Sequence, residues 1–122
     1  MKKSLFTFFL IAAMVLSIGG AAYAKSAKYR YSNGYVMEYK LYSISVAGES
    51  GVAAITSTDD SAVAFVSAFS YKNGTVKNSE SKQQPGYAYI GLSGEGGNSF
   101  RSGHALKDYD YVPYGQVLYL EQ

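Results

Sequence analysis

The side chains that could carry out chemistry are few, because the chain has one histidine, His104, and no cysteine. A serine nucleophile activated by histidine and aspartate is conceivable, with Asp108 or Asp110 as the third member. The chain lacks the G-x-S-x-G turn of such enzymes, however, and Ser102-Gly103-His104 lies within an alternating strand pattern. A zinc site needs three or four strong ligands, which one histidine without cysteine does not supply. We therefore expect His104 to be a hydrogen-bonded or half-exposed strand residue, and we expect no metal site.

The carboxylates could support a second kind of chemistry. Asp59-Asp60 falls in a turn, and Asp108 and Asp110 are spaced to share one face of a strand. Two carboxylates at a suitable separation can hydrolyse glycosides, and clustered oxygen ligands can bind calcium. Turns ordinarily use aspartate, and the chain has no D-x-D-x-D-G calcium loop. We expect the protein not to be an enzyme and to need no cofactor.

Tyrosine is the most unusual feature of the composition, with 13 tyrosines and no tryptophan. In a small domain with half-wetted sheets, tyrosine adds a large apolar area while its hydroxyl reaches water or a backbone partner. Most of the tyrosines are therefore expected to replace a thick core. Tyr109, Tyr111 and Tyr114 form the row that we select as an exposed binding platform for a glycan, a peptide or another copy of the chain.

The elements that must position these residues are strands. Tyr, Val, Phe, Ile and Thr recur, and turn-forming residues separate them at intervals of about ten residues, as in a small sandwich or barrel. Asn33-Gly34 and Asn73-Gly74 predict two hairpins in which both turn residues adopt a positive φ. Residues 62–71 fit a strand or an amphipathic helix, and the hairpin signal that follows favours a strand. Within residues 35–46 the large side chains change phase, which predicts a bulge or a change of sheet.

The N-terminus has the pattern of a secretion signal. Lys2 and Lys3 precede an apolar run over residues 5–18, and Ala22-Tyr23-Ala24 matches a small-x-small cleavage site. The run is shorter than the about 20 residues that a membrane-spanning helix needs. We expect residues 1–24 to be a signal peptide cut after Ala24, and residues 25–122 to be a single secreted all-β domain. Membrane contact is then expected during export alone, through the signal peptide.

The charge balance changes on this cleavage. Removing Lys2 and Lys3 from the 11 basic residues leaves as many basic as acidic residues, since the chain has 9 of the latter. A neutral chain is not expected to bind nucleic acid. Without cysteine, the fold must hold through sheet pairing and packing rather than disulfides, which suits an exoprotein of a Gram-positive bacterium.

Three segments carry a resemblance to known proteins: SAVAFVSAFSYKNGT (61–75), PGYAYIGLSG (85–94) and FRSGHAL (100–106). Their layout resembles a loose group of small secreted all-β proteins of Gram-positive bacteria, and it is distantly similar to the lactococcin-type bacteriocins. This resemblance implies a cysteine-free sandwich of two sheets. It rests on pattern rather than on a specific motif, so no functional residue is carried over.

The expected fold is all-β: a small antiparallel β-sandwich or partly open barrel of about six to eight strands, after a cleaved N-terminal signal helix. The expected function is that of an exported, non-enzymatic binding module at the bacterial cell surface or in the extracellular space. Its partner would be a cell-envelope glycan, a protein or another copy of itself. The alternative is a bacteriocin-like secreted toxin that acts on the cell envelopes of competitors.

Overall fold

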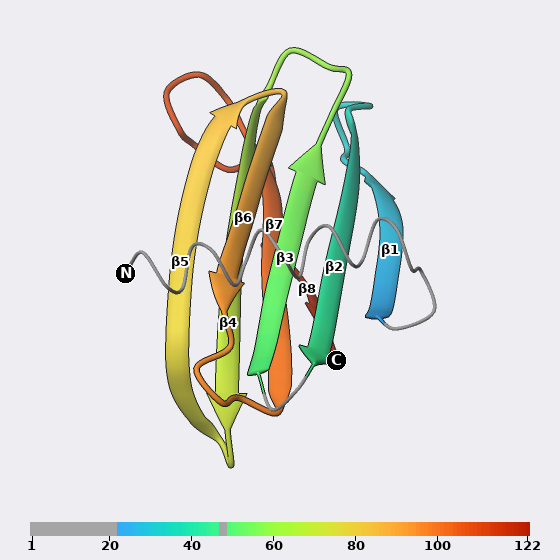
Figure 1. Ribbon diagram of the computed structural model, residues 1–122. Helices are drawn as coiled ribbons and strands as arrows, with labels where there is room; N and C mark the ends of the chain where they lie inside the picture. Colours follow the sequence, from blue (N-terminus) through green and yellow to red (C-terminus); the bar gives the residue numbers. More distant parts are fainter. Residues whose placement is uncertain (1–21, 47–48) are drawn as a thin grey trace.

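The computed structural model describes residues 22–46 and 49–122, which form two antiparallel β-sheets packed face to face (Figure 1). The all-β class is confirmed, and the two sheets remain separate rather than closing into a barrel. In the described ranges no helix is long and apolar enough to cross a membrane. The expected signal helix falls in residues outside those described. The strand β1 starts at Ala22, so the expected cleavage point after Ala24 lies inside this strand.

Within the described residues, each sheet has four strands. The first sheet has the order β1-β2-β3-β6 and consists of β1 (Ala22–Arg30), β2 (Val36–Val46), β3 (Glu49–Ser57) and β6 (Tyr87–Ser93). The second sheet has the order β5-β4-β7-β8 and consists of β5 (Thr75–Pro85), β4 (Val63–Lys72), β7 (Ser99–Lys107) and β8 (Leu118–Glu121).

Both Asn-Gly pairs reverse the chain, but they do so differently. Asn73 and Gly74 join β4 to β5 with φ values of 52° and 84°, which confirms the predicted two-residue turn. Of the first pair, Gly34 alone has a positive φ, 92°. Its loop is one residue longer, and Tyr31 N–H donates to Tyr35 O at 2.8 Å to close it. The expected positive φ at Asn33 is wrong, because this longer loop needs a left-handed residue at its last position alone.

The strand β4 points its small side chains inward and its aromatic side chains outward. Ala64, Val66 and Ala68 are fully buried between the sheets, whereas Phe65 and Phe69 are half-buried on the outer face. The opposing sheet supplies the bulk of the core through side chains such as Met37, Leu41 and Ile90. Small residues facing large ones fill the space between two sheets without strain. The strand interpretation of residues 62–71 is confirmed.

The strand β2 contains no bulge. It pairs with β1 and β3 in one unbroken register from Val36 to Val46, so the predicted bulge or change of sheet is wrong. The phase of the large residues changes because Ser43 takes an inward position, where its hydroxyl donates to Gln122 Oε1 at 2.9 Å. A hydrogen-bonded serine can occupy such a buried site. The sheets do have a register shift, but it lies between Ser70 and Tyr71 on β4.

Candidate binding surface

The loop after β7, residues 108–112, folds around one carboxylate. Asp108 Oδ1 accepts hydrogen bonds from the N–H groups of Asp110 at 2.9 Å and Val112 at 3.0 Å. The backbone adds a bond from Asp108 N–H to Val112 O and another from Tyr111 N–H to Asp108 O, each 2.9 Å long. The expectation that Asp108 and Asp110 share a strand face is wrong, because β7 ends at Lys107. The Asp108 carboxylate instead accepts hydrogen bonds from backbone N–H groups that follow it in the chain, which is the geometry of an aspartate turn. We call residues 108–112 the tyrosine loop.

Two rings of the candidate platform project from the tyrosine loop. Tyr109 is 60% exposed and Tyr111 is 56% exposed, and Val112 beside them is 55% exposed. Tyr111 has a φ of 65°, a left-handed conformation that costs a non-glycine residue about 1–3 kcal/mol. Such a conformation persists where the surrounding bonds over-determine it, and Asp108 supplies those bonds. The loop therefore holds two phenol rings outward on a fixed backbone.

Tyr114, the third member, has a different place. It is half-buried, with its ring centre 5.5 Å from that of Tyr35 and 6.4 Å from that of Tyr31, both in edge-on geometry. Burial raises the pKa of the Tyr114 phenol, and Tyr35, Asp108 and Tyr109 raise it further. Tyr114, two residues after the tyrosine loop, thus packs against the turn between β1 and β2. The three tyrosines are brought to one end of the molecule, but they do not form one exposed row.

Tyr31, which anchors this end, has no feature in the sequence that distinguishes it from the other tyrosines. Tyr31 is 3% exposed. Its hydroxyl accepts the Leu106 N–H at 3.0 Å and donates to Met37 Sδ at 3.7 Å. Burial raises the pKa of the Tyr31 phenol, and the hydrogen bond from the Leu106 backbone partly offsets that rise. Pro113 pairs with Lys107 of β7 in an isolated bridge. Because proline has no N–H to donate, no continuous strand forms there. Tyr31 thus links the turn of the first sheet to the second sheet.

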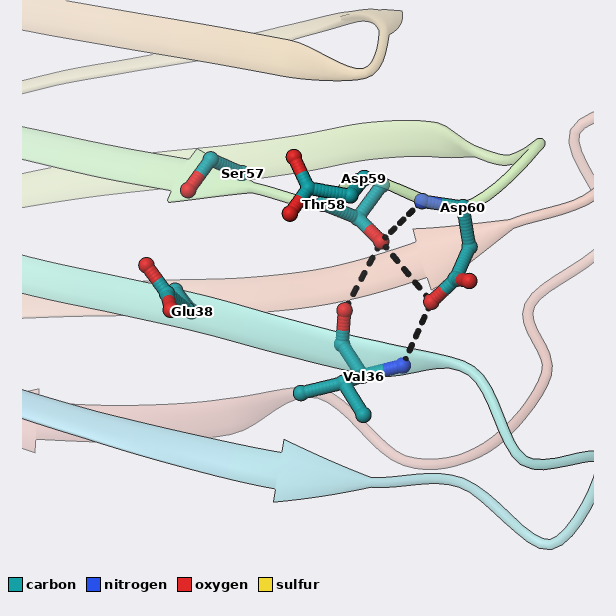
Figure 2. Close-up of a pocket in the computed structure, with 6 residues that line it drawn as sticks. All are labelled: Val36, Glu38, Ser57, Thr58, Asp59 and Asp60. Carbon is teal, nitrogen blue, oxygen red and sulfur yellow. Dashed lines mark hydrogen bonds between the residues drawn. The ribbon is translucent and has the colours of Figure 1, made fainter.

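The acidic pair Asp59-Asp60 lies beside a small hollow (Figure 2). Asp60 Oδ2 accepts the Val36 N–H at 2.8 Å, and Thr58 Oγ1 donates to Val36 O at 2.7 Å. These two side chains extend the ladder between β2 and β3 beyond its last backbone pair, Glu38 with Ser57. Glu38 itself pairs with a lysine of β1 at 3.2 Å. Asp60 and Glu38, the two carboxylates with partners here, are therefore engaged by separate structural groups.

His104 lies between the two sheets with both ring nitrogens occupied. Its Nδ1 is 2.7 Å from Thr56 Oγ1 on β3, and its Nε2 is 2.7 Å from Ser102 Oγ on β7. All three side chains are fully buried, and the Tyr39 ring packs 5.0 Å away, centre to centre. Burial lowers the pKa of His104 to about 4, and a backbone hydrogen bond at Ile55 acts in the opposite direction. The predicted hydrogen-bonded state is confirmed, but half-exposure is wrong because the ring crosses the space between the sheets.

Within residues 22–46 and 49–122, no group of three His, Cys, Asp or Glu side chains is arranged to hold a metal ion.

The comparisons with known proteins add no family. No family model matches the chain, and the searches of curated proteins and of solved structures find no match. The resemblance to lactococcin-type bacteriocins stays a prediction, so a function must be argued from the geometry of the chain itself.

Proposed function

We propose that the protein is an exported, non-enzymatic binding module whose contact surface is the tyrosine loop. The observation that carries this proposal is the pair of exposed rings, Tyr109 and Tyr111, on a backbone that Asp108 holds in a strained conformation. Tyrosine offers a large amphipathic contact area at a low cost in conformational entropy, which is why binding surfaces are rich in it. A loop that is already ordered loses little further entropy when it binds.

The surroundings of His104 support a role without catalysis. A general base or a nucleophile must come within hydrogen-bonding distance of its substrate. The Thr56, Ser102 and His104 side chains have no exposed surface, so their polar atoms serve one another. The proposed site of action, outside the cell, follows from the secretion pattern of residues 1–24.

The test compares retention of the secreted protein on cell-envelope fractions and on immobilised secreted proteins of Gram-positive bacteria. In the variant Tyr109→Ser/Tyr111→Asn both rings are lost, while asparagine still tolerates the left-handed backbone. We expect its retention to fall more than about tenfold, as for central aromatic contacts in interfaces. Tyr87→Ser is the matched control, because Tyr87 is also an exposed tyrosine, 51% exposed, but lies on β6.

Two results would count against the proposal. If the double variant is retained as well as the wild type, the tyrosine loop is not the contact surface. If the purified wild-type protein inhibits growth of related bacteria, and the double variant does not, the alternative of a bacteriocin-like toxin replaces the simple binding module.

A further inference from the structure

A groove of about 600 Å³ lies at the end of the sandwich opposite the tyrosine loop. Its lining includes Lys25, Tyr71, Phe100, Arg101, Glu121 and Gln122. The strand β7 runs from the groove, where Arg101 lies, to the tyrosine loop that begins at Asp108. At about 3.3 Å per residue the two surfaces are about 23 Å apart. The volume falls within the about 300–1,000 Å³ of small-ligand sites, so one or two aromatic side chains fit.

The groove combines the half-buried ring of Tyr71 with cations. Arg101 lies over the Tyr119 ring, 3.8 Å from its centre, and its Nε lies 3.3 Å from Glu121 Oε1. That approach is an ion pair without hydrogen-bond geometry, and the buried Nε has no hydrogen-bond partner in the described part of the chain. Lys25 adds a second, exposed cation from the first sheet. The expected cleavage after Ala24 would add a positive α-amino group to the same residue.

The tyrosine loop has the complementary character. It presents two exposed phenol rings, and the acids Asp108 and Asp110 alternate with them along the chain. We propose that the tyrosine loop of one molecule docks into this groove on a second copy. This inference rests on the proposed function, since it names the partner of the same loop. The rings of Tyr109 and Tyr111 pack against Tyr71, and the loop acids face Lys25 and Arg101.

The arrangement has a consequence for the assembly. The two surfaces differ and lie at opposite ends, so the contact is head-to-tail and adds molecules in a line. The processed chain has equal numbers of basic and acidic residues, so net charge does not oppose association. Edge-to-edge pairing is disfavoured along β5, whose exposed length carries Lys77, Glu80, Lys82 and Pro85. These charges and the proline therefore keep the β5 edge from pairing with a second copy.

The test is sedimentation velocity of the secreted protein over a range of concentrations, with its N-terminus verified by mass spectrometry. We expect the average mass to rise with concentration beyond that of a dimer, and to fall in 1 M salt, where the Debye length is about 3 Å. Lys25→Glu should weaken association at least about fivefold. Lys40→Glu, the same charge change at an exposed lysine on the outer face of β2, should not.

Mixing two defective variants gives the sharper result. Tyr109→Ser/Tyr111→Asn keeps an intact groove, and Lys25→Glu keeps an intact tyrosine loop. Each alone should be largely monomeric, but an equimolar mixture should form a 1:1 dimer that grows no further. Thermal unfolding of each variant checks that it is folded.

The inference is overturned if the wild type stays monomeric at all concentrations, or if the mixture forms no dimer. A monomeric wild type that still binds envelope fractions through Tyr109 and Tyr111 would end this inference and leave the proposed function standing. Loss of envelope binding in the Tyr87→Ser control instead would end the proposed function.

Discussion

At the scale of single residues, Tyr31 shows how this chain uses a phenol in place of a cross-link. Its ring packs with Tyr29 at 4.9 Å and with Tyr114 at 6.4 Å between ring centres, while its hydroxyl satisfies the Leu106 N–H of the other sheet. The apolar part of the side chain fills space, and the polar tip replaces a missing backbone partner. A phenylalanine could do the first but not the second.

Tyr31→Phe is therefore expected to lower the free energy of unfolding by about 1–3 kcal/mol, because it leaves the buried Leu106 N–H without a partner. Urea denaturation followed by circular dichroism measures the change. Tyr29→Phe is the matched control, since Tyr29 is 43% exposed and its loss of a hydroxyl should cost less than about 0.5 kcal/mol. Equal effects of the two changes would contradict this account of Tyr31.

At the scale of elements, short polar side chains hydrogen-bond the backbone groups that have no partner strand at the end of a β-strand. Asp60 and Thr58 bond both backbone groups of Val36 where β3 turns away from β2. Asp108 does the same for the tyrosine loop where β7 ends. Since unpaired backbone groups are costly at the end of a strand, these aspartates define where the strands stop and which way the loops leave.

Asp60→Ala should lower the free energy of unfolding by about 1–3 kcal/mol, since the Val36 N–H loses a charged acceptor. Asp59→Ala provides the control, because Asp59 precedes it in the same turn and is exposed. Its replacement should change stability by less than about 0.5 kcal/mol. Guanidinium denaturation of both variants gives the comparison, and a larger loss for Asp59→Ala would refute the assignment.

At the scale of the whole molecule, His104 joins the two sheets through its hydrogen bond to Thr56 of β3, while Ser102 on its own strand occupies the other ring nitrogen. A neutral ring suits this fully buried site, whereas an imidazolium there would place a charge between the sheets and both of its ring nitrogens would have to donate. Burial lowers the pKa of His104 from 6.5 to about 4, so the unfolded chain takes up this proton at a higher pH than the folded chain does. The pairing of the sheets therefore depends on pH.

The contribution of His104 to stability is complete above about pH 6.5 and is lost as the pH falls towards about 4. The loss is on the order of 3 kcal/mol, from about 1.4 kcal/mol per pKa unit. Melting temperatures of the wild type and of His104→Gln between pH 7.5 and pH 4.5 test this. The variant should be less stable at neutral pH and should lose less stability in that interval. An equal acid response in both proteins would show that other groups cause it.

The sequence was sufficient where a local rule decides the outcome. Asn73-Gly74 makes a two-residue turn because both of its residues readily adopt a positive φ, and residues 87–93 alternate because a strand has a period of two. The all-β class and the strand at residues 62–71 follow from the same local preferences. The exposure of Tyr109 and Tyr111 also agrees with the platform selected from the sequence, although its role in binding stays a proposal.

Features that depend on contacts between residues far apart in the sequence could be seen in the tertiary structure alone. Alternation along β4 showed two faces, but the bulk of the opposing sheet determined that alanine faces inward and phenylalanine outward. Ser43 interrupts the pattern of β2 because Gln122, far away in the chain, bonds it. His104 is buried and Tyr114 is half-buried for the same reason: their partners lie on other elements. Local propensity acts between neighbours in the chain, whereas burial is a property of the packed sheets, so the sequence could show the strands but not which of their polar residues would lie between them.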